Sequence, residues 1–344
     1  MKIVRFLAFP FSIIYAIVTS IRNWFFDVGI FKSTQFEKPI IAVGNLSVGG
    51  TGKTPQIEYL IRLLNSQYRV GVLSRGYGRK TKGFILANNS SSAESIGDEP
   101  LQFYQKFKKI TVAVDEKRVR GIQHLGELKN APEIILLDDA FQHRQVKAGF
   151  SVLLTKYDDL FSNDFVLPTG NLRERRVGVK RANIVVVTKC PKNISNEDQQ
   201  ETKQLIKRYF DGPIFFSTIK YATLLLNANS QQILTENLSN YKVLLVTGIA
   251  NPSSMLAYLS ELGCAYTHVN FPDHHQFTPK EIDDLNNRFE KLEGDNKIIL
   301  TTEKDFVRLS NNLENLYYLA IETSFVNQQK EFDDLITDYV AESL

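Results

Sequence analysis

The stretch SVGGTGKT at residues 47–54 decides the fold, because it lies between an apolar run, PIIAVGN, and a segment with helical periodicity, PQIEYLIRLL. A phosphate-binding loop is normally written G-x-x-x-x-G-K-[ST], and here Ser47 stands at the first position. A strand, a glycine-rich loop and a helix in this order surround phosphate oxygens with backbone N–H groups. The stretch therefore predicts a nucleotide site, and a glycine-rich turn that binds nothing is the alternative.

Each position of this phosphate loop has an expected role. Lys53 reaches the outer phosphates, which gives it a part in catalysis, and the Thr54 hydroxyl binds Mg²⁺. Ser47 replaces glycine at little cost if its backbone angles are ordinary. The expected nucleotide-binding residues are Ser47, Val48, Gly49, Gly50, Thr51, Gly52, Lys53 and Thr54.

Short apolar runs alternate with helix-period segments along the chain. The first series is PIIAVGN, RVGVLSRG, KITVAVD, EIILLDD, SVLLTK and NIVVVTK; the second, after residue 212, is PIFFSTIKY, YKVLLVTGI, AYTHVNF, KIILTTE and LYYLAIE. Near-continuous Val, Ile and Leu indicate strands covered on both faces, hence a mostly parallel sheet. We predict an α/β, phosphate-loop NTPase-like domain at 36–225 and a smaller α/β lobe at 226–344 that closes the cleft, with a hinge in the polar stretch 227–240.

Residues 1–35 form a separate amino-terminal segment. Its apolar run from Phe6 to Ile21 is bracketed by basic residues and followed by an aromatic cluster; the residues are Lys2, Arg5 and Arg22, then Trp24, Phe25 and Phe26. No small-residue site for signal-peptide cleavage follows, and the run is short for a spanning helix and contains Pro10. Basic and aromatic residues around an apolar helix favour docking at a membrane surface. A buried core helix is the alternative.

Composition limits the classes of partner. The 344 residues carry 41 basic and 38 acidic side chains, so no global field requires a nucleic acid. The two cysteines are far apart in sequence, which indicates neither a disulfide framework nor a zinc site. A reducing cytosol is the simplest location.

Two acidic segments supply candidate catalytic and metal-binding groups. In EIILLDDAFQH, Asp138 and Asp139 follow a strand at the edge where α/β sheets present ligands, so they are candidates for Mg²⁺ or its waters; turn residues are the alternative. In SIGDEPLQFYQKF, Asp98 precedes a helix that starts with proline, which favours a helix cap. A kinase, however, requires one carboxylate near the acceptor hydroxyl, and Asp98 is the candidate base.

Two further segments carry candidate catalytic side chains. FPDHHQF at 271–277 offers adjacent histidines that point apart, so at most one is expected to share a site with Asp98. LPTGNLRERR at 167–176 offers Arg173 to stabilise phosphoryl charge and Glu174 to join the metal shell, although charge runs are usually solvated faces.

Eight motifs in this order resemble the lipid A 4'-kinase (tetraacyldisaccharide 4'-kinase) family, from about residue 5 to about residue 310. They are VGNLSVGGTGKTP, LSRGYGRK, GDEP, DDAFQHR, LPTGNLRE, VVTKCP, FPDHHQF and TTEKD. The resemblance implies ATP- and Mg²⁺-dependent transfer of the γ-phosphate to the 4'-hydroxyl of a tetraacylated glucosamine disaccharide 1-phosphate. It also implies a lipid-linked substrate and a place at the cytoplasmic face of the bacterial inner membrane. We expect a monomer without a nucleic-acid partner.

The resemblance carries roles to particular residues. Gly49 to Thr54 bind ATP, Asp98 is the base assisted by His274, and Arg173 lies near the phosphates. Asp138, Asp139 and Glu174 fall around the metal. His275 stays an alternative to His274. The family often has glycine where this chain has Ala140, which makes the placement of Gln142 and His143 less secure if a positive φ is required there.

Two other classes of protein are compatible with a phosphate loop. A membrane-associated regulatory ATPase or GTPase often carries lysine before the paired glycines, where this chain has Val48, and TKCP at 188–191 lacks the aspartate of the guanine-reading N-K-x-D. A carbohydrate-lipid binding protein with a structural nucleotide would bind without phosphorylating its ligand.

Overall fold

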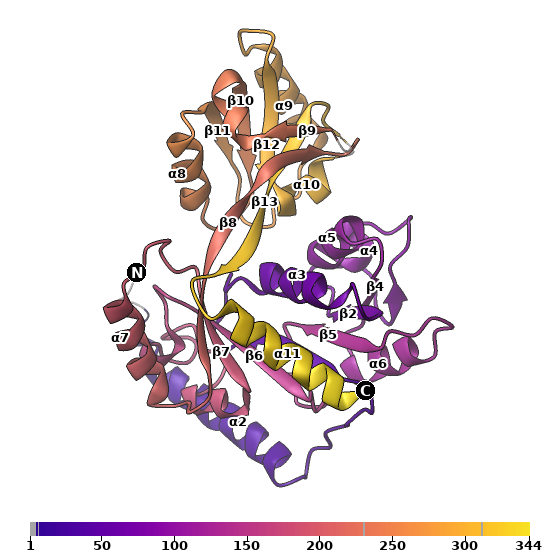
Figure 1. The fold of residues 1–344 in the computed structure, drawn as a ribbon, viewed down its shortest axis with the longest axis vertical. Helices are drawn as coiled ribbons and strands as arrows, with labels where there is room; N and C mark the ends of the chain where they lie inside the picture. Colours follow the sequence, from indigo (N-terminus) through magenta and orange to yellow (C-terminus); the bar gives the residue numbers. More distant parts are fainter. Residues whose placement is uncertain (1–4, 6, 230, 311) are drawn as a thin grey trace.

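The computed structural model describes residues 5, 7–229, 231–310 and 312–344, and it has two lobes stacked along its long axis (Figure 1). Lys2 and Phe6, which the sequence analysis placed at the start of the amino-terminal segment, lie outside the described residues. One continuous sheet order runs through both lobes: β11-β10-β12-β13-β8-β7-β6-β1-β5-β2-β4-β3, with β9 paired to β8.

The first lobe is built on parallel strands with the phosphate-loop strand β1 near the centre. The strands are β1 (Ile40–Asn45), β2 (Val70–Ser74), β4 (Thr111–Val114), β5 (Ile134–Asp138), β6 (Phe150–Lys156) and β7 (Ile184–Thr188), with the short antiparallel β3 (Ile85–Leu86) at the edge. β1 pairs with β5 on one side and with β6 on the other. The predicted mostly parallel α/β fold is confirmed.

Helices cover both faces of this sheet, as the apolar runs predicted. They are α3 (Lys53–Leu64), α4 (Ala93–Ile96), α5 (Asp98–Lys106), α6 (Arg118–Gly126) and α7 (Asn196–Lys207), with 3₁₀ turns at Phe161–Asn163 and Arg176–Arg181. Ile41 and Val43 of β1 pack into the core beneath α3, whereas Ile40 and Ala42 pack into the core beneath α6. Alternate residues of one strand are thus buried on opposite faces.

The second lobe is a smaller α/β unit. Its strands are β10 (Lys242–Thr247), β11 (Ala265–Asn270), β12 (Lys297–Thr302), β13 (Leu316–Phe325) and the short β9 (Gln232–Leu234); its helices are α8 (Ser253–Glu261), α9 (Pro279–Glu290) and α10 (Glu303–Leu309), with a 3₁₀ turn at Thr235–Asn240. β10, β11, β12 and β13 are parallel neighbours.

Two long strands join the lobes. β8 (Ile214–Asn227) pairs with β7 through Ile214–Phe216 and then continues into the second lobe as the antiparallel partner of β13. Figure 1 shows β8 and β13 crossing from one lobe to the other. The predicted hinge at 227–240 instead forms the β8–β9 hairpin and a 3₁₀ turn within the second lobe. Polar composition marked a surface turn there, not the connection between the lobes.

The last helix returns to the first lobe, although the sequence-based division at residue 226 grouped it with the second. α11 (Gln329–Ser343) buries Phe332, Ile336 and Val340 completely in the same core as α3 and β1. The Tyr59 hydroxyl of α3 donates a 2.7 Å hydrogen bond to Asp333 of this helix. The apolar stripe of α11 completes the cover over one face of the sheet, a long-range relation that a linear division cannot reveal.

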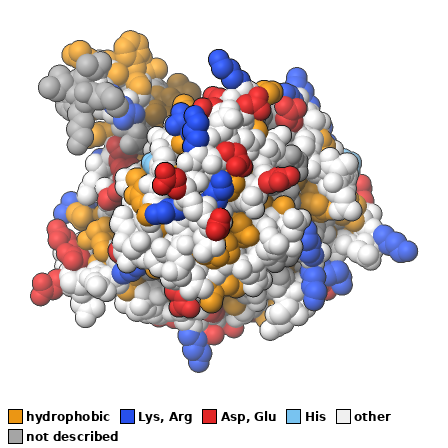
Figure 2. All heavy atoms as spheres, turned by 90° about the horizontal axis from the view of Figure 1, so that it is seen from above, with side chains coloured by type: hydrophobic (Ala, Val, Ile, Leu, Met, Phe, Trp, Pro, Cys, Tyr) orange, Lys and Arg blue, Asp and Glu red, His pale blue; other side chains and the backbone are white. Residues whose placement is uncertain are grey.

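The amino-terminal helix α2 (Phe9–Asp27) is turned opposite to an ordinary surface helix. Ser12 is its one buried residue, while Phe11, Ile14, Val18 and Trp24 are each more than half exposed. Figure 2 shows hydrophobic side chains gathered on the projection beside the residues that are not described. The buried-core alternative is therefore wrong. None of the described helices meets the length and hydropathy required to cross a membrane.

Candidate active site

The phosphate loop has the backbone that its glycines predicted. Gly49 and Gly52 adopt positive φ of 105° and 85°, while Ser47 is not among the described residues with positive φ. The buried Thr51 hydroxyl accepts a 2.8 Å hydrogen bond from Asn45 Nδ2. Thr188 at the end of β7 donates a hydrogen bond to the Thr51 carbonyl, also at 2.8 Å. The loop is thus fastened to β1 and to β7, and α3 begins at Lys53, which lines the cavity between the lobes.

The acidic pair at the end of β5 lies beside this loop. Asp139, at φ 46°, contacts Lys53 Nζ at 3.6 Å and Arg173 Nη1 at 2.9 Å. Burial acts to raise the pKa of Asp139, but the charges of Lys53 and Arg173 outweigh it, so that pKa lies below its ordinary value. The positive φ in this motif belongs to Asp139 and not to the residue after it. Ala140 has no positive φ, and its N–H bonds to the Val43 carbonyl, which removes the concern about Ala140.

Asp138 is placed to hold a cation. Its carboxylate is buried, and Oδ2 accepts a 3.0 Å hydrogen bond from Ser74 while Oδ1 has no hydrogen-bond partner among the described residues. Burial, together with the charges of Glu99 and Asp139, raises the pKa of Asp138 to about 7. An unpartnered buried carboxylate oxygen beside other carboxylates is stabilised by a divalent ion.

Glu99 joins this group, although the sequence analysis did not select it. The Thr54 hydroxyl donates to Glu99 Oε1 at 3.4 Å, which places a carboxylate of α5 directly at the phosphate loop. No group of three His, Cys, Asp or Glu side chains in the described part of the chain could hold a metal alone. Mg²⁺ is usually held by one or two carboxylates plus substrate phosphates, so Thr54, Asp138 and Glu99 fit a nucleotide-bound Mg²⁺.

Glu174 is not placed to join the metal shell. Its buried carboxylate accepts hydrogen bonds from Asn23 Nδ2 at 2.7 Å, from Arg181 Nη2 at 2.7 Å and from Gln142 Nε2 at 3.1 Å. Both oxygens are therefore occupied. A run of charges in sequence does not show which side chains turn inward; here Glu174 fastens helix α2 to the loop that carries Arg173, and we no longer propose it as a ligand.

The predicted base and its histidine meet across the lobes. Asp98 Oδ2 lies 3.2 Å from His274 Nδ1, and Arg308 Nη2 also lies 3.2 Å from Asp98 Oδ2. His274 Nε2 lies 2.9 Å from Lys304 Nζ. Because Lys304 can only donate, His274 receives that bond on Nε2 and carries its proton on Nδ1, toward Asp98. Asp98 Oδ1 makes no hydrogen bond with any described residue, and the Asp98 side chain is 12% exposed.

The helix-cap interpretation of Asp98 does not hold. Gly97, with φ 94°, is the cap residue of α5, and Asp98 is the first helical residue without a side-chain capping bond. The second histidine of the motif faces elsewhere: His275 Nε2 lies 3.1 Å from Glu281, and its ring stacks on Phe271 at 4.7 Å. His274 is thus the histidine that shares a site with Asp98.

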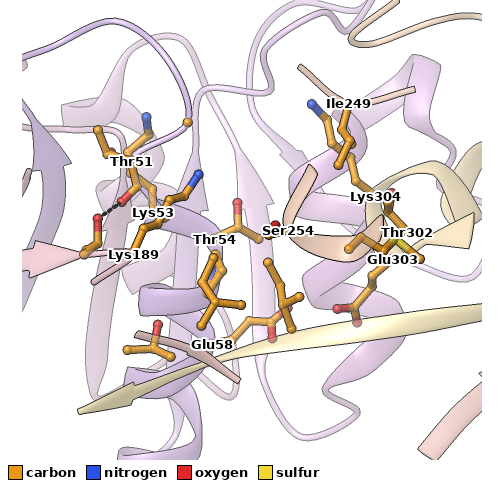
Figure 3. A pocket seen from close by; sticks show the side chains of 18 of the residues that line it. Thr51, Lys53, Thr54, Glu58, Lys189, Ile249, Ser254, Thr302, Glu303 and Lys304 are labelled. Atoms are coloured by element: carbon orange, nitrogen blue, oxygen red, sulfur yellow. Dashed lines mark hydrogen bonds between the residues drawn. The ribbon is translucent and has the colours of Figure 1, made fainter. Parts of the chain in front are cut away.

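The cleft between the lobes contains a cavity of about 270 Å³ next to the phosphate loop. Figure 3 shows Lys53 and Thr54 on one side of this cavity and Thr302, Glu303 and Lys304 on the other. Lys304 belongs to TTEKD, whose position beside the nucleotide the sequence left open between a binding role and a helix cap. The helix cap is present, because the Thr302 hydroxyl accepts a hydrogen bond from Asp305 N. Lys304 lines the cavity and contacts His274, and the binding role stays a prediction.

A phosphate loop beside a cavity between the lobes, a carboxylate group that fits Mg²⁺ and a carboxylate–histidine pair that spans the two lobes define a phosphate-loop phosphotransferase. The family model described as tetraacyldisaccharide-1-P 4'-kinase (LpxK) matches residues 4–341. The chain therefore belongs to the tetraacyldisaccharide-1-P 4'-kinase family, and the resemblance carried by the eight motifs is confirmed.

Relatives and a solved structure agree with this assignment. A tetraacyldisaccharide 4'-kinase of Flavobacterium psychrophilum is 54% identical, with 100% of this chain and 99% of the relative covered. One of Bacteroides thetaiotaomicron is 45% identical over 97% of this chain and 93% of the relative. The crystal structure of LpxK from Aquifex aeolicus in complex with ATP superposes with a TM-score of 0.78 at 30% identity, covering 98% and 99% of the two chains.

Proposed function

We propose that this protein is an ATP-dependent kinase that transfers the γ-phosphate to the 4'-hydroxyl of a tetraacylated glucosamine disaccharide 1-phosphate, which gives the bis-phosphorylated lipid A precursor. The observation that carries the proposal is the contact between Thr54 and Glu99. Because Asp98 is the neighbour of Glu99 in the chain, this contact supports the proposal that Asp98 acts near the loop that holds the donor. A regulatory ATPase has no acceptor hydroxyl to deprotonate, so it does not require a base beside the phosphate loop.

Asp98 and His274 act on the acceptor. Asp98 Oδ1, which has no hydrogen-bond partner among the described residues, accepts the hydroxyl proton as the oxygen attacks the γ-phosphorus, while His274 holds the carboxylate through Oδ2. Arg308 supports the same oxygen from the second lobe. The base is complete only with both lobes in contact, so closure protects ATP from hydrolysis by water.

Lys53 and Arg173 act on the transferring phosphoryl group. Both cations contact Asp139, so both lie at the same end of the phosphate loop. Fixed positive charge at this place stabilises the charge that develops on the phosphoryl oxygens. Thr54, Asp138 and Glu99 would hold Mg²⁺, which would supply positive charge to neutralise the nucleotide phosphates.

Helix α2 brings the site to the membrane surface. Its polar residues bond to the protein: the Ser12 hydroxyl contacts Thr169 at 2.8 Å, the Tyr15 hydroxyl donates to the Arg173 carbonyl at 3.0 Å, and Asn23 donates to Glu174. Its aliphatic residues are exposed and can enter lipid: Ile13, Ile14, Ile17, Val18 and Ile21. A lipid-borne acceptor thus meets the loop that carries Arg173. We place the enzyme as a peripheral monomer at the cytoplasmic face of the bacterial inner membrane.

The decisive assay uses labelled ATP and a tetraacyldisaccharide 1-phosphate acceptor in detergent micelles. We expect a labelled lipid product from the wild type, none from Lys53→Ala, and none with an acceptor that already carries a 4'-phosphate. ATP turnover without labelled lipid would instead assign the protein to the regulatory ATPases.

A further inference from the structure

Helices α5 and α10 form an antiparallel pair that joins the two lobes. The first residue of α5, Asp98, meets Arg308 near the end of α10; the last residue of α5, Lys106, meets Glu303 at the start of α10. Leu101 and Val307 pack against one core between the two ends. One ion pair therefore contains the candidate base, and its counterpart lies at the far end of the same helix.

Lys106 also contacts the helix of the phosphate loop. Its Nζ lies 2.7 Å from Glu303 Oε1 and 2.7 Å from Glu58 Oε2 of α3. Glu58 is one helical turn after Thr54, and Gln102 Nε2 of α5 donates to its other oxygen at 2.9 Å. The side chains of Glu58, Glu303 and Lys106 are 1%, 9% and 18% exposed. Lys106, the last residue of α5, therefore connects α5 to α3 of the phosphate loop and to α10 of the second lobe, at a place that is almost closed to solvent.

We propose that the Lys106–Glu303 pair is a positioning device for phosphoryl transfer: it fixes the second lobe against α5 so that His274 and Arg308 meet Asp98 at the phosphate loop. The proposal rests on the kinase function above, but neither residue touches the reacting atoms. A buried ion pair adds little net stability, because desolvation offsets attraction, yet it specifies one geometry. Without this ion pair, the apolar contact between Leu101 and Val307 allows α10 to slide along α5. Asp98 and His274 then no longer lie within hydrogen-bond distance.

The cleanest variant is Glu303→Gln. It keeps the shape of the side chain and leaves Lys106 paired with Glu58, so no buried charge is orphaned. We expect kcat to fall about tenfold to hundredfold, as for a misplacement near 1 Å, with KM for ATP within about threefold. The melting temperature should stay within about 2 °C or rise. A kcat within about twofold of wild type, or a loss explained by a lower melting temperature, would overturn the proposal.

Two further variants complete the set. Lys106→Met leaves Glu303 without its cation, whereas Glu58 keeps Arg62 at 3.2 Å. Lys106→Arg, which keeps the charge, should retain at least half of the turnover that Lys106→Met loses. The matched control is Glu322→Gln, which removes a 3.1 Å ion pair with Arg62 of α3 but touches neither α5 nor α10. Because Glu322 is 42% exposed, its loss should change kcat by less than about twofold.

A distance measurement tests the device without the acceptor. The native Cys190 and Cys264 are buried, so spin labels can be attached at Gln123→Cys in α6 and Asn286→Cys in α9. With a non-hydrolysable ATP analogue and Mg²⁺, we expect a single narrow distance in the wild-type background and a broader distribution with Glu303→Gln. Identical distributions would overturn the proposal. If the wild type makes no labelled lipid, the kinase function fails, and the distances alone decide the fate of the Lys106–Glu303 pair.

Discussion

Asp98 Oδ2 and His274 Nδ1 lie 3.2 Å apart, although 176 positions separate the two residues in the chain and each belongs to a different lobe. Asp98 starts the helix α5 next to the phosphate loop, and His274, at φ 58°, sits in a turn between β11 and α9. A site divided in this way exists only while the lobes are in contact.

Asp98→Asn should lower kcat about 10²- to 10⁴-fold with ATP affinity nearly unchanged, because the base acts on the acceptor and not on the bound nucleotide. Steady-state kinetics and nucleotide titration check the two halves separately. His274→Ala should cost less than Asp98→Ala. The control is His275→Ala: its ring contacts Glu281 and Phe271 outside the pair, so turnover should barely change. A larger loss at His275 than at His274 would assign the role to the other histidine.

The double change Ile14→Asp and Val18→Asp should weaken binding to anionic lipid vesicles at least about tenfold, since each exposed aliphatic side chain contributes about 1.5–3 kcal/mol when buried in lipid. The two side chains are 60% and 59% exposed on α2. Co-sedimentation with phosphatidylglycerol vesicles measures the change. Leu234→Asp, at a site 44% exposed in the second lobe, is the matched control. Equal sedimentation of all variants would refute docking through α2.

The stability of the protein should depend on pH through Glu303. Burial, followed by the charge of Glu58, raises the pKa of Glu303 to about 7, while Lys106 acts in the opposite direction. A carboxyl whose pKa is raised by folding disfavours the folded state once it ionises. The contribution of Glu303 to the free energy of unfolding is fully present below about pH 4.5 and is lost as pH rises through about 7. In this range the free energy of unfolding falls by up to about 1.4 kcal/mol per pH unit.

Urea unfolding of wild type and Glu303→Gln across this pH range isolates that contribution. The wild type should lose stability relative to the variant as pH increases. A constant difference between the two proteins, or one that grows in favour of the wild type at high pH, would contradict the sign.

Phe332→Ala in α11 should destabilise the phosphate-loop lobe by about 3–5 kcal/mol, because it empties a fully buried site. The ring packs on Phe325 at 4.4 Å and on Phe215 at 5.4 Å. Urea unfolding measures the change. Lys330→Ala, on the exposed side of the same helix, should stay within about 0.5 kcal/mol of wild type. Similar effects at both positions would mean that α11 is not part of this core.

The sequence predicts the local features of the site well. Gly49 to Thr54 required a strand before them and a helix after them, and both are present. Asp138 and Asp139 followed from a buried strand that ends in two acids. In each case a few consecutive residues carry the whole signal, so periodicity and turn chemistry suffice.

Relations between distant segments were not readable in this way. The sequence predicted Glu174 as a metal ligand, but in the structure its carboxylate accepts hydrogen bonds from Asn23 and Arg181. Glu99 was not predicted, although it belongs to the same motif as Asp98. Thr54 and Glu99 are 45 positions apart, and only the packing of α5 against α3 brings them together. The prediction of the connection between the lobes was wrong for the same reason, because the connection depends on the pairing of β13 with β8 across about a hundred positions.

The hydrogen bond from Asn23 to Glu174 attaches helix α2 to the loop that carries Arg173. A helix of 19 residues is about 28 Å long, so a tilt of α2 would also move that loop. On the proposal that α2 docks in the headgroup layer, the depth of α2 would set the height of the phosphate loop above the bilayer. Such an enzyme would select its acceptor hydroxyl by its distance from the lipid surface as well as by its chemistry.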